Sequence, residues 1–256
     1  MTRLTPQQRA QLYDVENVWA PDDDFFLAQV NAQPASRVLD IGCGTGRLAI
    51  AAAGHRVVGI DPDAASLTAA RAKPGAAAVT FIDGTSAQIP TDGPFDTALM
   101  TAHVAQAIFE ADAWLQTLSD IAAALRPGGL LTFDSRDPAA RGWERWTAEL
   151  TRGDFTLPDG TTGESWIDHT REANGLVTFD ELVLVPGGTP EVQSSVLAFR
   201  SETQLRADLA ATGFTVEAIH GGWNGEPVGA GAGELIVVAR RNPVDLNAAS
   251  SYTRVH

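Results

Sequence analysis

The chain has 256 residues, enough to bury a hydrophobic core without disulfides or structural metals. Its 18 basic and 32 acidic residues give a formal net charge of −14, the wrong sign for a surface that neutralises phosphates, so we expect no nucleic-acid partner. The single cysteine, Cys43, allows no intrachain disulfide. No stretch resembles a signal peptide or a membrane span, so we expect a soluble, cytoplasmic protein without membrane contact.

The amino-acid composition argues against several kinds of enzyme chemistry. Lys73 is the only lysine and precedes Pro74-Gly75, so neither a GxxxxGK[ST] phosphate loop nor a Schiff base is expected. The five histidines show no HExxH spacing and no pairing with cysteine, and we therefore expect no metal site.

Residues 1–36 precede the first strand-like run, and we expect them to form a helical lid over a ligand. Tyr13 and Trp19 supply aromatic surface, and the acidic run Asp22–Asp24 follows them. A solvated helix cap is the alternative interpretation of the acidic run.

Residues 37–136 alternate short apolar runs with amphipathic stretches, the pattern of βαβ units around a parallel sheet. The predicted strands are Arg37–Ile41, Arg56–Ile60, Ala78–Ile82, Phe95–Met100 and Leu130–Asp134. The predicted helices are Thr45–Ala53, Asp63–Ala72 and Asp112–Arg126, with Asp63 and Asp112 as N-caps. Arg126-Pro127-Gly128-Gly129 is expected to end the last helix before the next strand.

The pattern changes in residues 137–200, where three strand-like runs follow one another: Glu164–Glu172, Leu176–Val185 and Val192–Arg200. We interpret them as an inserted antiparallel β-meander, either a substrate cap or a dimer surface. Residues 201–241 return to the α/β core, with a helix over Ser201–Thr212 and strands over Thr215–His220 and Glu234–Arg240. Residues 242–256 are predicted to be a loose tail.

The segment that carries chemistry reads RVLDIGCGTGR from Arg37 to Arg47. An apolar strand passes into three glycines and then a helix, so the backbone can approach a ligand closely at the strand's carboxyl end. A dinucleotide fingerprint would need glycine where the chain has Arg47. Asp40 lies two positions before the first glycine, and Asp61 ends the second strand, where a carboxylate can accept both ribose hydroxyls. The segment therefore predicts a crevice that binds a nucleoside and is unfavourable for a pyrophosphate group.

Four elements in register resemble the class I S-adenosylmethionine-dependent methyltransferases. They are Asp40-x-Gly42-x-Gly44-x-Gly46, Asp61 closing strand two, Asp83-Gly84 closing strand three, and Arg126-Pro127-Gly128-Gly129 before strand five. The resemblance implies a mostly parallel, seven-stranded sheet of order 3-2-1-4-5-7-6 with helices on both faces. The β insertion is similar to that of sugar and small-amine N-methyltransferases.

The resemblance also implies S-adenosylmethionine as cofactor, with S-adenosylhomocysteine as its product. Asp40 and the glycine loop would hold the methionine moiety, Asp61 the ribose and Asp83 the adenine amine. The expected cofactor-binding residues are Tyr13, Asp40, Gly42, Cys43, Gly44, Thr45, Gly46, Asp61, Pro62, Asp83, Gly84 and Thr101. An ordinary turn is the alternative role of Asp61 and Asp83.

The acceptor is expected where the loops after strands four, five and six converge. Its expected contacts are Trp19, His103, Gln106, Arg136 and Trp223. His103 lies just past strand four, where an imidazole can take a proton near neutral pH, and its open roles are general base, pocket-lining hydrogen bonder and structural residue. Trp223 either contacts the acceptor or packs its own loop. Asp134 and Asp137 are interpreted as loop carboxylates rather than metal ligands.

These features predict an enzyme that transfers a methyl group from S-adenosylmethionine to a small molecule by direct displacement. The acceptor atom stays open among oxygen, nitrogen and carbon. Met100-Thr101-Ala102-His103 stands where [DN]PP[YF] would indicate methylation of a nucleic-acid base. The alternatives are a cyclase or decarboxylase of the same fold and a non-catalytic cofactor-binding protein. A homodimer is compatible with the insertion.

Overall fold

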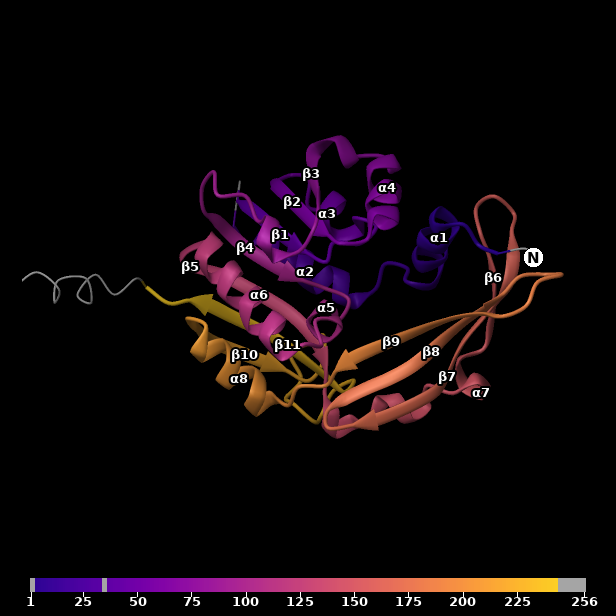
Figure 1. Ribbon diagram of the computed structural model, residues 1–256. Helices are drawn as coiled ribbons and strands as arrows, with labels where there is room; N and C mark the ends of the chain where they lie inside the picture. The colour runs from indigo at the N-terminus through magenta and orange to yellow at the C-terminus, as the bar shows by residue number, and fades with distance from the viewer. Residues whose placement is uncertain (1–2, 34–35, 244–256) are drawn as a thin grey trace, which may run out of the picture.

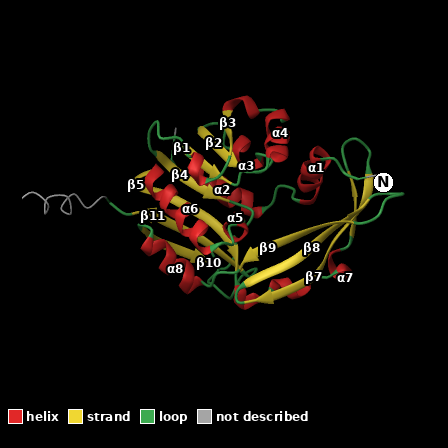
Figure 2. Ribbon diagram, in the orientation of Figure 1, coloured by secondary structure: helices red, strands yellow, loops and turns green. Residues whose placement is uncertain are grey.

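The computed structural model describes residues 3–33 and 36–243, so most of the predicted tail lies outside the described residues. Two β-sheets dominate (Figure 1, Figure 2). The larger is layered with helices, and the smaller projects to one side, with α1 (Pro6–Glu16) beside its far end. Within the described residues, no helix combines the length and apolar character needed to cross a membrane.

The larger sheet has the strand order β3-β2-β1-β4-β5-β11-β10. Its strands are β1 (Arg37–Ile41), β2 (Arg56–Asp61), β3 (Val79–Asp83), β4 (Phe95–Met100), β5 (Leu125–Arg136), β10 (Phe214–His220) and β11 (Glu234–Arg241). β11 pairs antiparallel with both β5 and β10, and the other pairs in this sheet are parallel. β10 and β11 are the sixth and seventh strands that the chain contributes to this sheet. The predicted α/β class with a mostly parallel sheet is confirmed.

Helices cover both faces of this sheet because its strands alternate their apolar side chains. Leu39 of β1 packs in one core cluster with α6 (Ala111–Ala124) and α8 (Glu202–Ala211). Its neighbour Val38 packs in another cluster with α2 (Pro21–Asn31) and α3 (Arg47–Ala51). The remaining helices near this sheet are α4 (Ala64–Ala72) and the short α5 (Val104–Ala107). The carboxyl ends of the parallel strands form an edge between these layers.

The helices of the larger sheet begin where the backbone permits. α3 starts at Arg47 rather than at the predicted Thr45, because Gly46 precedes it with φ +74°, outside the helical range. Asp63 caps α4 as predicted, accepting two backbone N–H groups.

The predicted start and end of α6 need correction. The helix is preceded by Glu110, and Asp112 lies inside it instead of capping it. At its other end Leu125 already pairs with Phe95 of β4, so Pro127-Gly128-Gly129 lies within β5 rather than before it. The positive φ of Gly128 accommodates this irregularity in the strand.

The smaller sheet has four strands where the sequence predicts three. β6 (Gly153–Thr156), β7 (Thr162–Ala173), β8 (Leu176–Leu184) and β9 (Glu191–Ala198) pair antiparallel in chain order, with α7 (Ala148–Thr151) against β7. The sequence pattern does not reveal β6, because only one of its four residues has a large apolar side chain. Asn174 and Gly175 form the turn between β7 and β8, both at positive φ, as such hairpins require.

Trp114 of α6 anchors its helix to the larger sheet. Its side chain is 1% exposed, meets the ring of Phe133 edge-on at 5.7 Å and lies 4.5 Å from the guanidinium of Arg200. Its Nε1 donates to Asp208 of α8 at 2.9 Å. One indole therefore joins α6, β5 and α8.

Replacing Trp114 with alanine should destabilise the protein by about 3–5 kcal/mol, because the change leaves a core cavity and removes the donor to Asp208. Denaturant unfolding measures this loss. Leu115 on the same helix is 37% exposed, and Leu115→Ala should cost less than about 1 kcal/mol. Equal losses in the two variants would contradict the packing described.

Candidate functional site

A glycine loop, residues 42–46, leads from β1 into α3 at the carboxyl edge of the larger sheet. The N–H of Gly42 donates to the carbonyl of Ile60 at 2.7 Å, which holds the loop against β2. Gly42 has φ +72°, and a Cβ there would lie 2.4 Å from the side chain of Val104 in α5. Position 42 therefore requires glycine.

The carboxylate of Asp61 braces this loop from β2. It is 8% exposed, and its oxygens accept the backbone N–H of Gly44 at 2.7 Å and of Asp63 at 2.8 Å. Burial raises the pKa of Asp61, while these two hydrogen bonds act in the opposite direction. Asp61 thus joins the glycine loop to the start of α4, a larger role than that of a turn residue.

Asp40 in β1 is the second buried carboxylate of this edge. It is 1% exposed, and its Oδ1 has no hydrogen-bond partner among the described residues. Burial, with the negative charge of Asp61 adding to it, raises the pKa of Asp40 to about 7. Because an unpartnered buried carboxylate is costly, this position fits a ligand group that donates hydrogen bonds or carries positive charge.

Other expected cofactor residues lie along the same edge. Asp83 ends β3 in register with Asp61, is exposed, and is followed by Gly84. Pro62 is exposed directly after Asp61. An exposed edge beside a buried carboxylate leaves room for a ligand that both contact.

Cys43 and Thr101 complete the expected set. Burial raises the pKa of the Cys43 thiol, and a Cβ on Gly59 would lie 2.8 Å from its sulfur, so Cys43 fills the space between the loop and β2. Thr101 is half-buried directly after β4.

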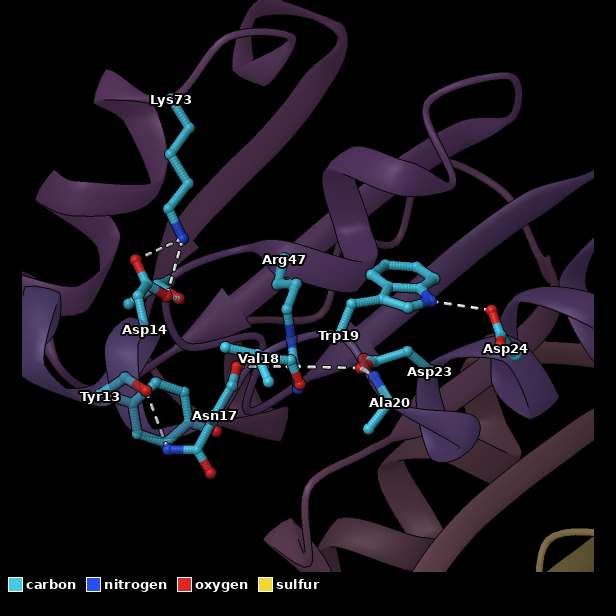
Figure 3. A network of polar contacts seen from close by, with 11 residues as sticks. Tyr13, Asp14, Asn17, Val18, Trp19, Ala20, Asp23, Asp24, Arg47 and Lys73 are labelled. Atoms are coloured by element: carbon cyan, nitrogen blue, oxygen red, sulfur yellow. Dashed lines mark hydrogen bonds and ion pairs between the residues drawn. The ribbon is translucent and has the colours of Figure 1, made fainter. Parts of the chain in front are cut away.

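Lys73 fastens α1 to the site (Figure 3). Its ammonium lies 2.7 Å from the carboxylate of Asp14, and the hydroxyl of Thr45 in the glycine loop donates to the same carboxylate. Asp14 therefore bridges α1, the glycine loop and the end of α4. Tyr13 beside it is 41% exposed.

Arg47 holds the segment between α1 and α2 (Figure 3). Its guanidinium donates to the carbonyls of Asn17 and Val18 at 2.6 and 2.7 Å and pairs with Asp23 at 3.1 Å. Asp23 is 3% exposed and accepts the N–H of Ala20. This part of the acidic run is therefore a buried cap rather than a solvated one.

The two tryptophans expected at the acceptor lie in different surroundings. Trp19 is 41% exposed, and its Nε1 donates to Asp24 at 2.8 Å (Figure 3). Trp223 packs edge-on against Phe25 and Phe26, with ring centroids 5.9 and 5.7 Å apart. Trp223 thus packs the loop after β10 onto α2, in line with the loop-packing alternative.

His103 meets two carboxylates at this edge. Its backbone N–H donates to Asp134 Oδ2 at 3.0 Å, and its Nε2 lies 3.0 Å from Glu234 Oε2 and 3.3 Å from Asp134 Oδ2. Ala102 and His103 both have positive φ, 54° and 63°, a strained pair that these contacts support. Glu234 reaches the cluster because β11 runs antiparallel and therefore begins where β4 and β5 end.

This cluster has more hydrogen-bond acceptors than its imidazole can satisfy. Asp134 is 0% exposed, burial raises its pKa, and its Oδ1 has no partner among the described residues. Nε2 carries at most one proton, which two carboxylates cannot both accept with good geometry. The three side chains place one ligand atom each within 4.8 Å of one another, which is also close enough to hold a metal ion. The cluster suits a ligand that brings donors or positive charge.

Gln106, expected at the acceptor, is fully buried with both ends of its amide bonded within the protein. It is 0% exposed, its Oε1 accepts from Arg136 Nη1 at 3.0 Å, and its Nε2 donates to the carbonyl of Ala198 at 3.4 Å. The guanidinium of Arg136 lies 5.1 Å from the ring of Trp146, and burial lowers its pKa. Gln106 therefore positions Arg136 and links the larger sheet to β9.

Three residues of the site, Glu234, Lys73 and Asp134, are not among those expected from the sequence. Asp134, interpreted there as a loop carboxylate, lies fully buried within β5. The topology of the sheet could have indicated Glu234, because a final antiparallel strand begins at the edge where the parallel strands end. Lys73 reaches Asp14 across 59 positions of the chain, and no local pattern marks such a contact.

Residues 38–129 match the family model described as a methyltransferase domain. The chain is 31% identical over 209 residues to the cypemycin N-terminal methyltransferase of Streptomyces sp, covering 80% of this chain and 82% of that relative. The CcbJ methyltransferase of Streptomyces caelestis has a TM-score of 0.72 at 20% identity, covering 91% of this chain and 97% of that one. CalS10 of Micromonospora echinaspora, an amino pentose methyltransferase bound to S-adenosylmethionine, has a TM-score of 0.68 at 23% identity, covering 94% and 100%.

The matched family region contains the glycine loop and Asp61. The cypemycin relative is aligned over most of both chains, and the solved structures share the overall fold. The chain belongs to the class I S-adenosylmethionine-dependent methyltransferases.

Proposed function

We propose that this methyltransferase uses S-adenosylmethionine to methylate the nitrogen of a small-molecule amine. The acceptor class rests on the His103 cluster, where two carboxylates and an imidazole converge and one buried oxygen of Asp134 has no partner among the described residues. An amine offers both N–H donors and positive charge to such a cluster. The relatives named for N-terminal and amino pentose methylation are consistent with a nitrogen acceptor.

The residues around the glycine loop fit the cofactor. Asp40, with its unpartnered Oδ1, would receive the ammonium of the methionine moiety. Asp61 would accept the ribose hydroxyls, and Asp83 the adenine amine. Tyr13 and Asp14 would cover the methionine end, since Lys73 holds this part of α1 against the loop.

S-adenosylmethionine supplies a methyl group on a sulfonium, already activated for displacement. The protein must align the acceptor and leave its nitrogen unprotonated. Most amines carry a proton at neutral pH. Because the Nε2 of His103 faces both carboxylates, the other ring nitrogen, Nδ1, would take that proton. Asp134 and Glu234, at 3.3 and 3.0 Å, then stabilise the imidazolium.

Asp61→Ala should weaken binding of S-adenosylhomocysteine about tenfold to hundredfold, because charge-assisted hydrogen bonds worth ~1.5–3 kcal/mol and the brace on Gly44 are lost together. Titration calorimetry measures the affinity. Asp112→Ala on the exposed side of α6 makes the same change in charge and serves as the control. Unchanged affinity in Asp61→Ala would refute the assigned role.

Binding of S-adenosylhomocysteine at about pH 6 should release a proton from Asp40. The pKa of this carboxyl is raised to about 7 in the free protein, so it is mostly protonated below that pH, and a ligand ammonium favours its ionised form. Cofactor affinity should therefore increase between about pH 5 and 7. Calorimetry in buffers of different ionisation enthalpy counts the released protons. The release should disappear in Asp40→Asn, and its persistence there would exclude Asp40 as the source.

Methyl-labelled S-adenosylmethionine should pass its label to amines and not to alcohols of the same carbon skeleton. With the amine that takes most label, His103→Ala should lower kcat by about a hundredfold while cofactor affinity stays unchanged, because a general base is lost. His169→Ala, at an imidazole 66% exposed on the smaller sheet, is the matched control.

Three outcomes would count against this function. Label in alcohols alone would contradict the amine class. Label in neither class would favour the cyclase or decarboxylase alternative. Loss of transfer on adding a chelator would mean that His103, Asp134 and Glu234 act as metal ligands instead of proton acceptors.

A further inference from the structure

A cavity of about 690 Å³ lies between α1 and the smaller sheet. α1 contributes Tyr13 and Glu16 to its lining, the start of α4 contributes Asp63, and the sheet contributes Trp166, Glu181 and Gln193. The volume is that of a small-molecule site, typically ~300–1,000 Å³. In Figure 1, α1 stands between α4 and the far end of the smaller sheet, which matches this lining.

The cavity borders the proposed reaction site through two residues. Asp63 donates its backbone N–H to Asp61, the residue assigned to the ribose. Tyr13, which lines the cavity, directly precedes Asp14, whose carboxylate accepts a hydrogen bond from the hydroxyl of Thr45 in the glycine loop. A cavity beside Asp61 and the glycine loop can hold the part of an acceptor that extends beyond its reacting amine.

The lining carries an excess of negative charge. Arg9 is the one basic residue among the described lining residues, and it is already paired with Glu191, which lies outside the lining. Glu16 and Glu181 have no ion-pair partner among the residues that the structure describes. Among the described residues, these two carboxylates of the lining therefore lack an ion-pair partner.

Serine hydroxyls orient both glutamates. Ser165 donates to Glu16, and Ser195 donates to Glu181 at 3.4 Å. Partial desolvation raises the pKa of Glu181 and the negative charge of Glu16 adds to the rise, while the hydrogen bond from Ser195 and the charge of Arg9 lower it. A cation between the two carboxylates would relieve this repulsion.

We propose that this cavity binds the part of the acceptor remote from the methylated nitrogen, and that this part carries an ammonium or guanidinium group held by Glu16 and Glu181. The inference rests on the proposed function, because the cavity sets specificity only if the chain methylates an acceptor. A neutral group would leave the carboxylates uncompensated, and a phosphate or carboxylate would add repulsion. Glu16 and Glu181 are therefore specificity-determining residues that select dicationic amines against anionic ones.

The test uses three eight-carbon probes with one amine in common: 1,8-diaminooctane, 8-aminooctan-1-ol and 8-aminooctanoate. Calorimetry on the full chain saturated with S-adenosylhomocysteine should find the diamine bound about tenfold tighter than the amino alcohol, with the amino acid weakest. The preference should fall to about twofold or less in Glu16→Gln and in Glu181→Gln. It should persist in Glu149→Gln, which makes the same change in charge at an exposed residue of α7 that does not line the cavity.

Equal affinity for the diamine and the amino alcohol, tightest binding of the amino acid, or no measurable binding of the diamine would each overturn the inference. So would a preference that survives in both cavity variants. Binding of S-adenosylhomocysteine is recorded in the same samples, with circular dichroism as the check on folding. If the cofactor product binds while the diamine preference is absent, this inference fails and the proposed function stands; if the product does not bind, the proposed function fails.

Discussion

Asp40, Asp61 and Asp134 are buried near the carboxyl ends of parallel strands of the larger sheet. The arrangement of this edge depends on which hydrogen-bond donors or positive charges each carboxylate meets. A buried carboxylate without partners costs free energy, so each one constrains the groups around it. Asp61 is satisfied by backbone N–H groups and thereby holds the glycine loop against α4. Asp134 is bonded by His103 and thereby supports the strained backbone after β4. Asp40 keeps an unpartnered oxygen, and the same is true of one oxygen of Asp134. Two points of the edge are therefore prepared for donors or cations from ligands.

Basic residues are the minority in this chain, with 18 against 32 acidic ones, and two of them attach the N-terminal helices to the ligand edge. Lys73 and Arg47 both come from elements that follow the first strands, and both reach back to the segment around α1 and α2. Because Asp14 shares its carboxylate between Lys73 and Thr45, the position of α1 is coupled to the glycine loop. The helix that covers the loop is also the helix that lines the cavity.

The smaller sheet is joined to the rest of the molecule at two places. Near the larger sheet, Gln106 bonds both Arg136 and the carbonyl of Ala198 in β9. At the far end, α1 is tied to the sheet by the ion pair of Arg9 with Glu191. The cavity lies along this second junction, and three of its lining residues, Glu16, Asp63 and Glu181, are acidic. The insertion thus contributes both surface and negative charge to this cavity.

The sequence by itself determined the α/β class, the glycine loop and the position of Asp61. Each of these depends on neighbours within one or two elements. The signals are the alternation of apolar residues, a strand that runs into glycines, and a carboxylate that ends the next strand. It also located His103 at the correct strand end. The tertiary structure decided what surrounds these residues. Glu234 lies 131 positions from His103, and only the antiparallel direction of β11 brings the two together. Gln106 was expected from its place after β4, yet only packing decided that its amide bonds Arg136 and the carbonyl of Ala198. Contacts between residues far apart along the chain are set by how the layers pack, and such packing leaves no periodic trace in the sequence.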